Sequence, residues 1–164
     1  MIIIEFEKPK TSDKKKVASS VVAKENAHQV IMAIKDGSNY ASSLYYNPQI
    51  ELKEVRSGKE NGSTSAISAY HTNYQSNGIF HDDSKICSFY IPYSARAESR
   101  QVTYERRYLD TKYLTSVIFH ESTPILHRKL TFIVPDWLDV ELKEMNFEGY
   151  KIIGDFSYIK KILS

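Results

Sequence analysis

The chain has 164 residues, of which 41% are hydrophobic and 26% are charged, and its formal net charge is +2. A chain of this length buries about 70% of the surface that its unfolded form exposes, so we expect one domain, residues 1–164, that folds without disulfide or metal support. The 22 basic and 20 acidic residues nearly balance. This argues against nucleic acid as a partner, because phosphate binding needs clustered lysine and arginine. The single cysteine, Cys87, excludes an internal disulfide and a cysteine-based zinc site.

The N-terminal segment predicts a short strand and no targeting signal. Residues 2–6 have the apolar character of a strand that ends before Pro9, and the rest of residues 1–16 is polar and expected to be loosely ordered. A basic start, a long apolar run and a small-residue cleavage site are all missing here, so a signal peptide is not expected. No run in the sequence approaches the roughly 18 apolar residues of a membrane-spanning helix.

The region from Val17 to Ile34 allows two interpretations. Its valines and isoleucines have partly helical spacing with alanines between them, which predicts one short helix that ends at the turn 36–39. The alternative is a pair of strands joined by a turn near Asn26. We prefer the helix.

Several strands are expected between residues 40 and 91. Strand-like composition occurs at residues 40–46, 49–55, 65–70 and 85–91, and residues 57–63 have the glycines and charges of a loop. The run 85–91 is apolar at nearly every position, so we expect this strand to be covered on both faces.

The stretch from Gln101 to Leu142 has the clearest strand pattern. Apolar and polar residues alternate in three runs, around Tyr104, around Phe132 and around Val140, separated by prolines and polar turns. A period of two places successive side chains on opposite faces of a strand. Many short strands with polar turns predict an all-β fold, a two-layer antiparallel β-sandwich with at most one short helix near the N-terminus.

Tyrosine is the most unusual feature of the composition, with twelve tyrosines beside seven phenylalanines and one tryptophan. A tyrosine ring packs while its hydroxyl stays hydrated, so half-buried strands explain the excess most simply. Ligand stacking is the alternative, and it requires that the rings share one solvent-facing patch. Its candidate residues are Tyr93, Tyr104, Tyr108, Tyr113 and Trp137.

The candidates for catalytic chemistry are weak. Cys87 lies inside an apolar run, where a cysteine is expected to be buried and inert. His71, His81 and Asp83 could contribute to a metal site, but their spacing matches no metal-binding template and fits ordinary turn chemistry better. We therefore assign no catalytic residue, no cofactor and no metal ligand.

Short motifs carry a family resemblance. They are Gly78–Lys85, Phe89–Pro92, the pair Tyr104–Glu105, Pro124–Lys129 and Phe132–Pro135. Together they resemble a bacterial domain of unknown function that precedes transglutaminase-like domains. One departure is that Tyr93–Arg96, after Pro92, lacks the glycine found in the turn of that family.

The resemblance implies an all-β domain of an exported cell-envelope protein, periplasmic or associated with the outer membrane. It also implies that a Cys-His-Asp triad lies in a following domain, to which residues 150–164 would begin the connection. We therefore expect a non-catalytic accessory domain that positions a partner domain, a polypeptide or a glycan. Two alternatives stay open: a stand-alone carbohydrate- or ligand-binding module that uses the five aromatic residues, and a small metal-dependent enzyme that uses His71, His81 and Asp83.

Overall fold

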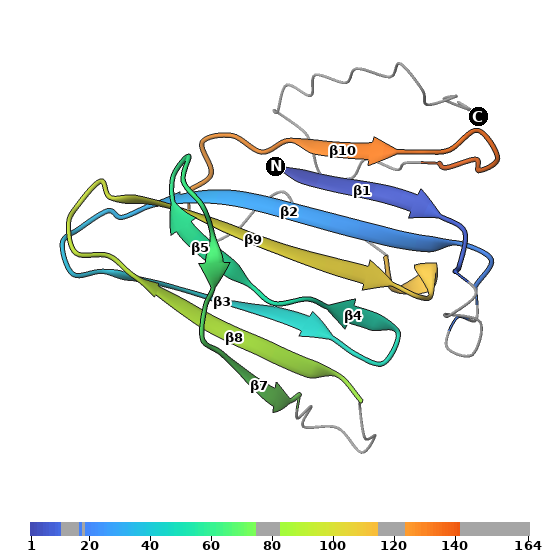
Figure 1. The fold of residues 1–164 in the computed structure, drawn as a ribbon, viewed down its shortest axis with the longest axis horizontal. Coiled ribbons are helices and arrows are strands. Elements are labelled where there is room, and N and C mark those ends of the chain that lie inside the picture. Colours follow the sequence, from blue (N-terminus) through green and yellow to red (C-terminus); the bar gives the residue numbers. More distant parts are fainter. Residues whose placement is uncertain (11–16, 18, 75–82, 115–123, 142–164) are drawn as a thin grey trace.

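The computed structural model describes residues 1–10, 17, 19–74, 83–114 and 124–141, which form two β-sheets (Figure 1). One sheet has seven strands in the order β10-β1-β2-β9-β5-β6, with β4 also paired to β9, and the other has the order β3-β8-β7. The pairing of β1 with β10 is parallel and the others are antiparallel. The predicted all-β fold with two layers is confirmed, and its strands are mostly antiparallel.

The bounds of the elements follow chain order. They are β1 (Ile2–Glu7), β2 (Val22–Met32), β3 (Asn39–Tyr46), β4 (Ile50–Leu52), β5 (Arg56–Lys59), β6 (Ser65–Ala66), β7 (Ala69–Asn73), β8 (Lys85–Pro92), β9 (Ser99–Tyr108), the 3-10 helix η2 (Thr111–Tyr113) and β10 (Leu130–Ile133). In the part of the chain that the structure describes, no helix has the length and apolar character needed to span a membrane.

Strands β2 and β9 form the long central pair of the seven-stranded sheet. Their register runs from Ala23 opposite Tyr108 to Met32 opposite Ser99. Beyond this end, residues 33–38 carry the chain from β2 to β3, and residues 93–98 carry it back from β8 to β9. Both connections therefore pass from one sheet to the other, as the two loops at the left of Figure 1 show.

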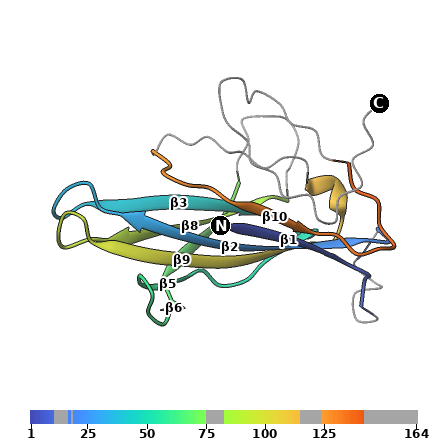
Figure 2. The same ribbon diagram turned by 90° about the horizontal axis from the view of Figure 1, so that it is seen from above.

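The two crossing connections are bonded to each other. The backbone N–H of Ala33 donates to the carbonyl of Glu98 at 2.9 Å, and that of Ala97 donates to the carbonyl of Ala33 at 2.8 Å. The backbone N–H of Arg96 donates to the Asp36 carboxylate at 2.6 Å. Because the crossings are tied together, β3 and β8 pair in the second layer as β2 and β9 pair in the first (Figure 2).

Two apolar clusters fill the interior. The first lies between the sheets and contains Ala33, Leu44, Val55, Cys87, Phe89, Ile91, Tyr93 and Val102. The second lies on the same inner face of the seven-stranded sheet, toward β1 and β10, and is centred on Ile4, Ala23 and Tyr108. Alternation along β9 supplies both clusters, because its even-numbered residues face inward.

The helix predicted for residues 17–34 is wrong, and so is the turn near Asn26. Residues 22–32 form one continuous strand in which Asn26 lies opposite Glu105. The alternation was obscured because an acidic residue, Glu25, occupies an inward position between Ala23 and Ala27 and is only 3% exposed. The partners that make this burial possible are distant in sequence.

The expectation that the strand at 85–91 is covered on both faces is also wrong. Cys87, Phe89 and Ile91 are buried, but Tyr90 is 53% exposed. Strand β8 alternates in the ordinary way, and Tyr90, an aromatic residue on its exposed face, gives the sequence a continuous apolar character. Two further predictions are wrong. Residues 57–59, predicted as part of a loop, belong to β5. The run around Val140, predicted as a strand, forms none in the described residues 138–141.

The buried phenol of Tyr93 makes the free energy of unfolding depend on pH in the alkaline range. Its hydroxyl donates to the carbonyl of Ile31 at 3.1 Å, and burial raises the pKa of Tyr93 to about 12. Since the unfolded phenol ionises near pH 10, this contribution is complete below about pH 10 and is lost as the pH rises toward 12.

We expect the free energy of unfolding to fall across this pH window, and to fall less steeply in a Tyr93→Phe variant. Urea denaturation at a series of pH values measures both slopes. Equal slopes for the two proteins would contradict the prediction.

Candidate functional site

The five aromatic residues proposed for stacking do not share one patch. Tyr93 and Tyr108 are each 4% exposed, and Tyr104 packs against the cluster between the sheets. Only Tyr113 and Trp137 are exposed, the first in η2 and the second after β10. Buried rings cannot present a face to a ligand, so this set fails the requirement of common exposure.

The histidine and aspartate candidates gain no support as a metal site. The structure describes His71 and Asp83, whereas His81 lies outside the described residues. The Nδ1 atom of His71 is hydrogen-bonded to the Tyr46 hydroxyl at 2.9 Å. Within residues 1–10, 17, 19–74, 83–114 and 124–141, no group of three His, Cys, Asp or Glu residues could hold a metal ion.

Cys87 lies in β8 and is 1% exposed. Burial raises the pKa of its thiol, which disfavours the thiolate that a nucleophile requires. The predicted burial of this cysteine is confirmed.

A polar cluster that the sequence did not reveal is buried on the inner face of the seven-stranded sheet. Nη2 of Arg106 lies 2.9 Å from both carboxylate oxygens of Glu25, and the Tyr108 hydroxyl donates to the same carboxylate at 2.7 Å. The guanidinium also lies over the rings of Tyr104 and Tyr108, at 5.7 and 5.6 Å. The two charges pair with each other, while Nε of Arg106 is buried without a hydrogen-bond partner. Because the carboxylate and the guanidinium already hold each other, the cluster indicates a structural role rather than a site for a ligand.

The ionisation of this cluster follows from its burial. Burial raises the pKa of the Tyr108 phenol, and the neighbouring Glu25 carboxylate raises it further. Burial alone would lower the pKa of Arg106, but the Glu25 carboxylate offsets this and holds it above its ordinary value. Arg106 therefore stays charged, and Tyr108 stays protonated and donates.

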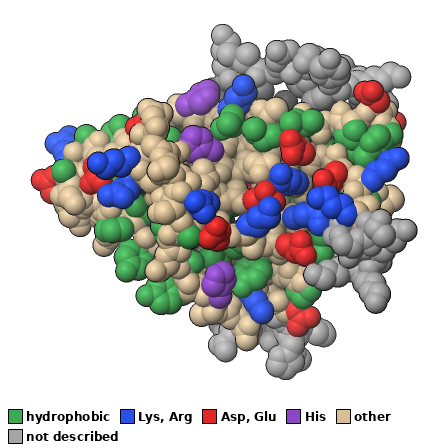
Figure 3. Space-filling view, in the orientation of Figure 1, with side chains coloured by type: hydrophobic (Ala, Val, Ile, Leu, Met, Phe, Trp, Pro, Cys, Tyr) green, Lys and Arg blue, Asp and Glu red, His purple; other side chains and the backbone are tan. Residues whose placement is uncertain are grey.

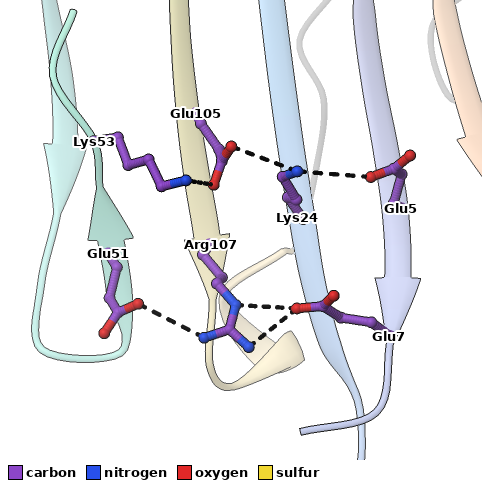
Figure 4. Close-up of polar contacts among 7 residues, drawn as sticks. All are labelled: Glu5, Glu7, Lys24, Glu51, Lys53, Glu105 and Arg107. Atoms are coloured by element: carbon purple, nitrogen blue, oxygen red, sulfur yellow. Dashed lines mark hydrogen bonds and ion pairs between the residues drawn. The ribbon is translucent and has the colours of Figure 1, made fainter. Parts of the chain in front are cut away.

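The outer face of the seven-stranded sheet is covered by paired charges, and side chains of both signs gather on the side that Figure 3 shows. Lys24 of β2 and Arg107 of β9 are direct cross-strand partners, which alone would be unfavourable. Each of them instead forms an ion pair with a diagonally placed acidic residue. Lys24 Nζ lies 3.5 Å from Glu105, and Arg107 Nη2 lies 3.0 Å from Glu7 (Figure 4). Opposite charges therefore alternate across these strands.

Glu105 is the centre of one row of this network. It also accepts from Lys53 at 2.7 Å. Partial burial would raise the pKa of the Glu105 carboxyl, but the ammonium groups of Lys53 and Lys24 lower it below its usual value.

A shallow, open depression of about 380 Å³ lies on this same face, over β1, β2 and β9 and beside residues 53–56. Its volume is at the lower end of the range for ligand sites. However, its charged lining residues already pair with one another, Lys53 with Glu105 and Arg56 with Glu54 at 2.8 Å. A ligand would have to displace these pairs, so this depression is not our leading candidate.

The outer face of the three-stranded sheet is different, because no charged residue belongs to it among the described residues. Its positions alternate with the buried Leu44, Cys87, Phe89 and Ile91. We call this surface the tyrosine face. Its members are Asn39, Ala41, Ser43, Tyr45, Tyr70, Thr72, Tyr74, Ile86, Ser88, Tyr90 and Pro92.

Four tyrosines dominate this face. Tyr45, Tyr70 and Tyr90 are 52%, 62% and 53% exposed, and each comes from a different strand. Tyr74, which follows β7, meets Tyr45 edge-to-face with ring centroids 5.5 Å apart. The four rings are therefore exposed, and the rings of Tyr45 and Tyr74 also restrain each other.

Hydroxyl groups lie between the rings. Ser43 of β3 and Ser88 of β8 are cross-strand partners, and their Oγ atoms lie 2.9 Å apart. Tyr70 of β7 lies opposite Ser88 on the other side. The face thus combines large amphipathic rings with adaptable hydroxyls on a rigid sheet, a combination that is also typical of antibody contact surfaces.

Comparison of the chain with protein-family models, with curated proteins and with solved structures gave no match. The family resemblance of the short motifs therefore stays a prediction. The tyrosine face is the best candidate for a functional surface on geometry alone.

The buried ion pair gives a direct test of its structural role. We expect Glu25→Leu to lower the free energy of unfolding by about 3–5 kcal/mol, because Arg106 would keep a buried charge without its partner. Replacing both residues, Glu25→Leu with Arg106→Met, should destabilise much less than Glu25→Leu alone. Chemical denaturation measures all three proteins. A double variant less stable than the single one would contradict this role.

Proposed function

We propose that this chain is a non-catalytic docking domain that binds a partner polypeptide on its tyrosine face. The observation that carries the proposal is the contrast between the two outer faces. One is covered by charges that pair with each other, and the other has no charged residue at its described positions and exposes Tyr45, Tyr70 and Tyr90. Tyrosine is enriched where proteins contact each other, and charged residues are depleted at the centres of such contacts.

The spread of the rings over this surface supports a macromolecular partner. The depression described above lies on the other sheet, whereas Tyr45, Tyr70 and Tyr90 come from three paired strands of the tyrosine face. Small ligands bind in concave sites that bury most of their surface. Rings distributed over three strands are contacted together only by an extended partner surface.

The resemblance of the short motifs extends the proposal to a biological setting. Under it, the chain is the accessory domain of an exported, transglutaminase-like protein of the bacterial cell envelope. The partner is then the catalytic domain of that protein or a polypeptide on which that domain acts. Catalysis would belong to residues outside this chain.

A glycan is the second candidate partner. It is favoured by the hydroxyls of Ser43 and Ser88 beside exposed tyrosine rings, since rings stack on sugars and hydroxyls bond to them. The edge-to-face contact of Tyr45 with Tyr74 is less favourable, because two perpendicular rings cannot both lie flat against one sugar chain.

Site-specific photo-cross-linking tests the docking surface even while the identity of the partner is open. A benzophenone amino acid placed at Tyr90 in the producing cells should form a discrete adduct with a polypeptide. The matched control is the same probe at Tyr113, which is exposed but does not belong to the tyrosine face. Mass spectrometry of the adduct identifies the partner.

With that partner in hand, we expect Tyr70→Ala and Tyr90→Ala each to weaken binding at least about tenfold, as buried interface tyrosines do. Tyr113→Ala should leave binding unchanged. Adducts that form equally at both probe positions, or at neither, would refute a polypeptide site on this face. Calorimetric titration with soluble neutral oligosaccharides then tests the glycan as partner. A glycan site on this face requires a heat of binding that the Tyr90→Ala substitution abolishes.

A further inference from the structure

Within the described part of the chain, strand β7 is an unprotected edge of the three-stranded sheet. It pairs with β8 on one side, and no strand of the described residues pairs with its other side. Four of its five residues are exposed, and its sequence, Ala-Tyr-His-Thr-Asn, contains no lysine, proline or acidic residue. Sheet edges with free backbone groups are normally protected by charges, prolines, bulges or very short strands, because they otherwise pair with another chain.

The edge strands of the seven-stranded sheet are shorter than β7. Among the described residues, β6 has two residues, β4 has three, including Glu51, and β10 (Leu130–Ile133) has four and is flanked by Lys129 and Pro135. The other edge of the three-stranded sheet is β3, which lies beside β4 in Figure 1. Leu44 of β3 and Val55, which follows β4, belong to the same apolar cluster. Strand β7 lies at the margin of the molecule in that view.

The sequence of β7 is complementary to itself when two copies run antiparallel. Full overlap of the five residues places His71 opposite His71, Tyr70 opposite Thr72 and Ala69 opposite Asn73. Tyrosine opposite threonine is a favourable cross-strand pair, and no like charges from β7 meet in this register. A twofold axis perpendicular to the sheet also keeps the tyrosine faces of both copies on the same side.

From this complementarity we propose that a second copy of this chain pairs with β7, antiparallel and centred on His71. The two three-stranded sheets join into one six-stranded sheet in the order β3-β8-β7-β7-β8-β3. Around the axis, His71 of each copy stays bonded to the Tyr46 hydroxyl of its own copy. The pairing satisfies the edge groups of β7 in both chains.

This dimer goes beyond the docking proposal and does not depend on it. Edge pairing uses backbone groups and leaves the rings of Tyr45 and Tyr90 exposed. Two tyrosine faces on one side of a continuous sheet would engage a repetitive or paired partner more tightly than one face alone. Either proposal can fail while the other holds, because self-association is measured without any partner.

Paired cysteine variants of the full chain test the register. Tyr70→Cys and Thr72→Cys are prepared separately, mixed and oxidised, and the mixture should form a disulfide-linked dimer, because these positions are direct cross-strand partners between copies. The matched control is Asn73→Cys alone, since two copies of this residue would lie about 13 Å apart along the paired strands. Positions 70 and 72 face away from Cys87, which lies opposite His71 and therefore on the other face of the sheet.

Analytical ultracentrifugation of the unmodified chain, from micromolar to submillimolar concentration, should show a concentration-dependent dimer. A chain that stays monomeric over this range overturns the proposal. A dimer whose mixed cysteine variants do not cross-link, or in which Asn73→Cys cross-links as well as the mixture, overturns it too.

Charge at the axis gives a second test that needs no oxidation. His71→Lys places two ammonium groups opposite each other, so we expect the dissociation constant of the dimer to rise several-fold. Mixing His71→Lys with His71→Glu should restore association as a heterodimer. Asn73→Lys, on the same face but away from the axis, should change the constant by much less. Equal effects at both positions would overturn the central placement of His71.

Discussion

The pairing of β2 with β9 is the constraint on which the rest of the structure depends. Its register, Ala23 opposite Tyr108 through Met32 opposite Ser99, decides which side chains face inward on the central strands. At one end of this pair, the connections from β2 to β3 and from β8 to β9 both cross between the sheets. Hydrogen bonds from the backbone N–H groups of Ala33 and Ala97 hold these two connections together. Since a one-residue slip would turn every side chain to the other face, the two apolar clusters and the ion pair of Glu25 with Arg106 all require this one register.

The same register separates two kinds of outer surface. On the seven-stranded sheet, like charges at Lys24 and Arg107 are directly opposite, and acids on the diagonal make the arrangement favourable. Such a surface keeps a protein in solution and discourages contact, because a partner would have to replace each pair. On the three-stranded sheet no charge has to be displaced among the described positions. Contact with a partner therefore costs less desolvation on the tyrosine face than on the charged face.

The sequence predicts the fold better than it predicts the site. Strand β9 is evident because Val102, Tyr104 and Tyr108 alternate with charged residues, and strand β1 is evident from its isoleucines. Strand β2 is not, since the inward Glu25 breaks the apolar period and its partner Arg106 lies 81 residues away. Pattern alone gives the faces of a strand but not which face another sheet covers. Tyr93 therefore looked like a ligand contact but is buried, whereas Tyr90 looked buried but is exposed.

The tyrosine face and the edge of β7, which no other described strand pairs with, belong to one sheet, and this coincidence supports a role in contact. Uncharged sheet faces and unprotected edges both favour association, so a domain that acts alone would gain from a lysine at either place. The chain has 22 lysine and arginine residues, yet the described positions of β7 and of the tyrosine face contain none. Tyrosine and serine keep such a surface hydrated through their hydroxyls without the desolvation cost of charge. Covering a surface of this composition therefore costs less desolvation than covering one that carries charges.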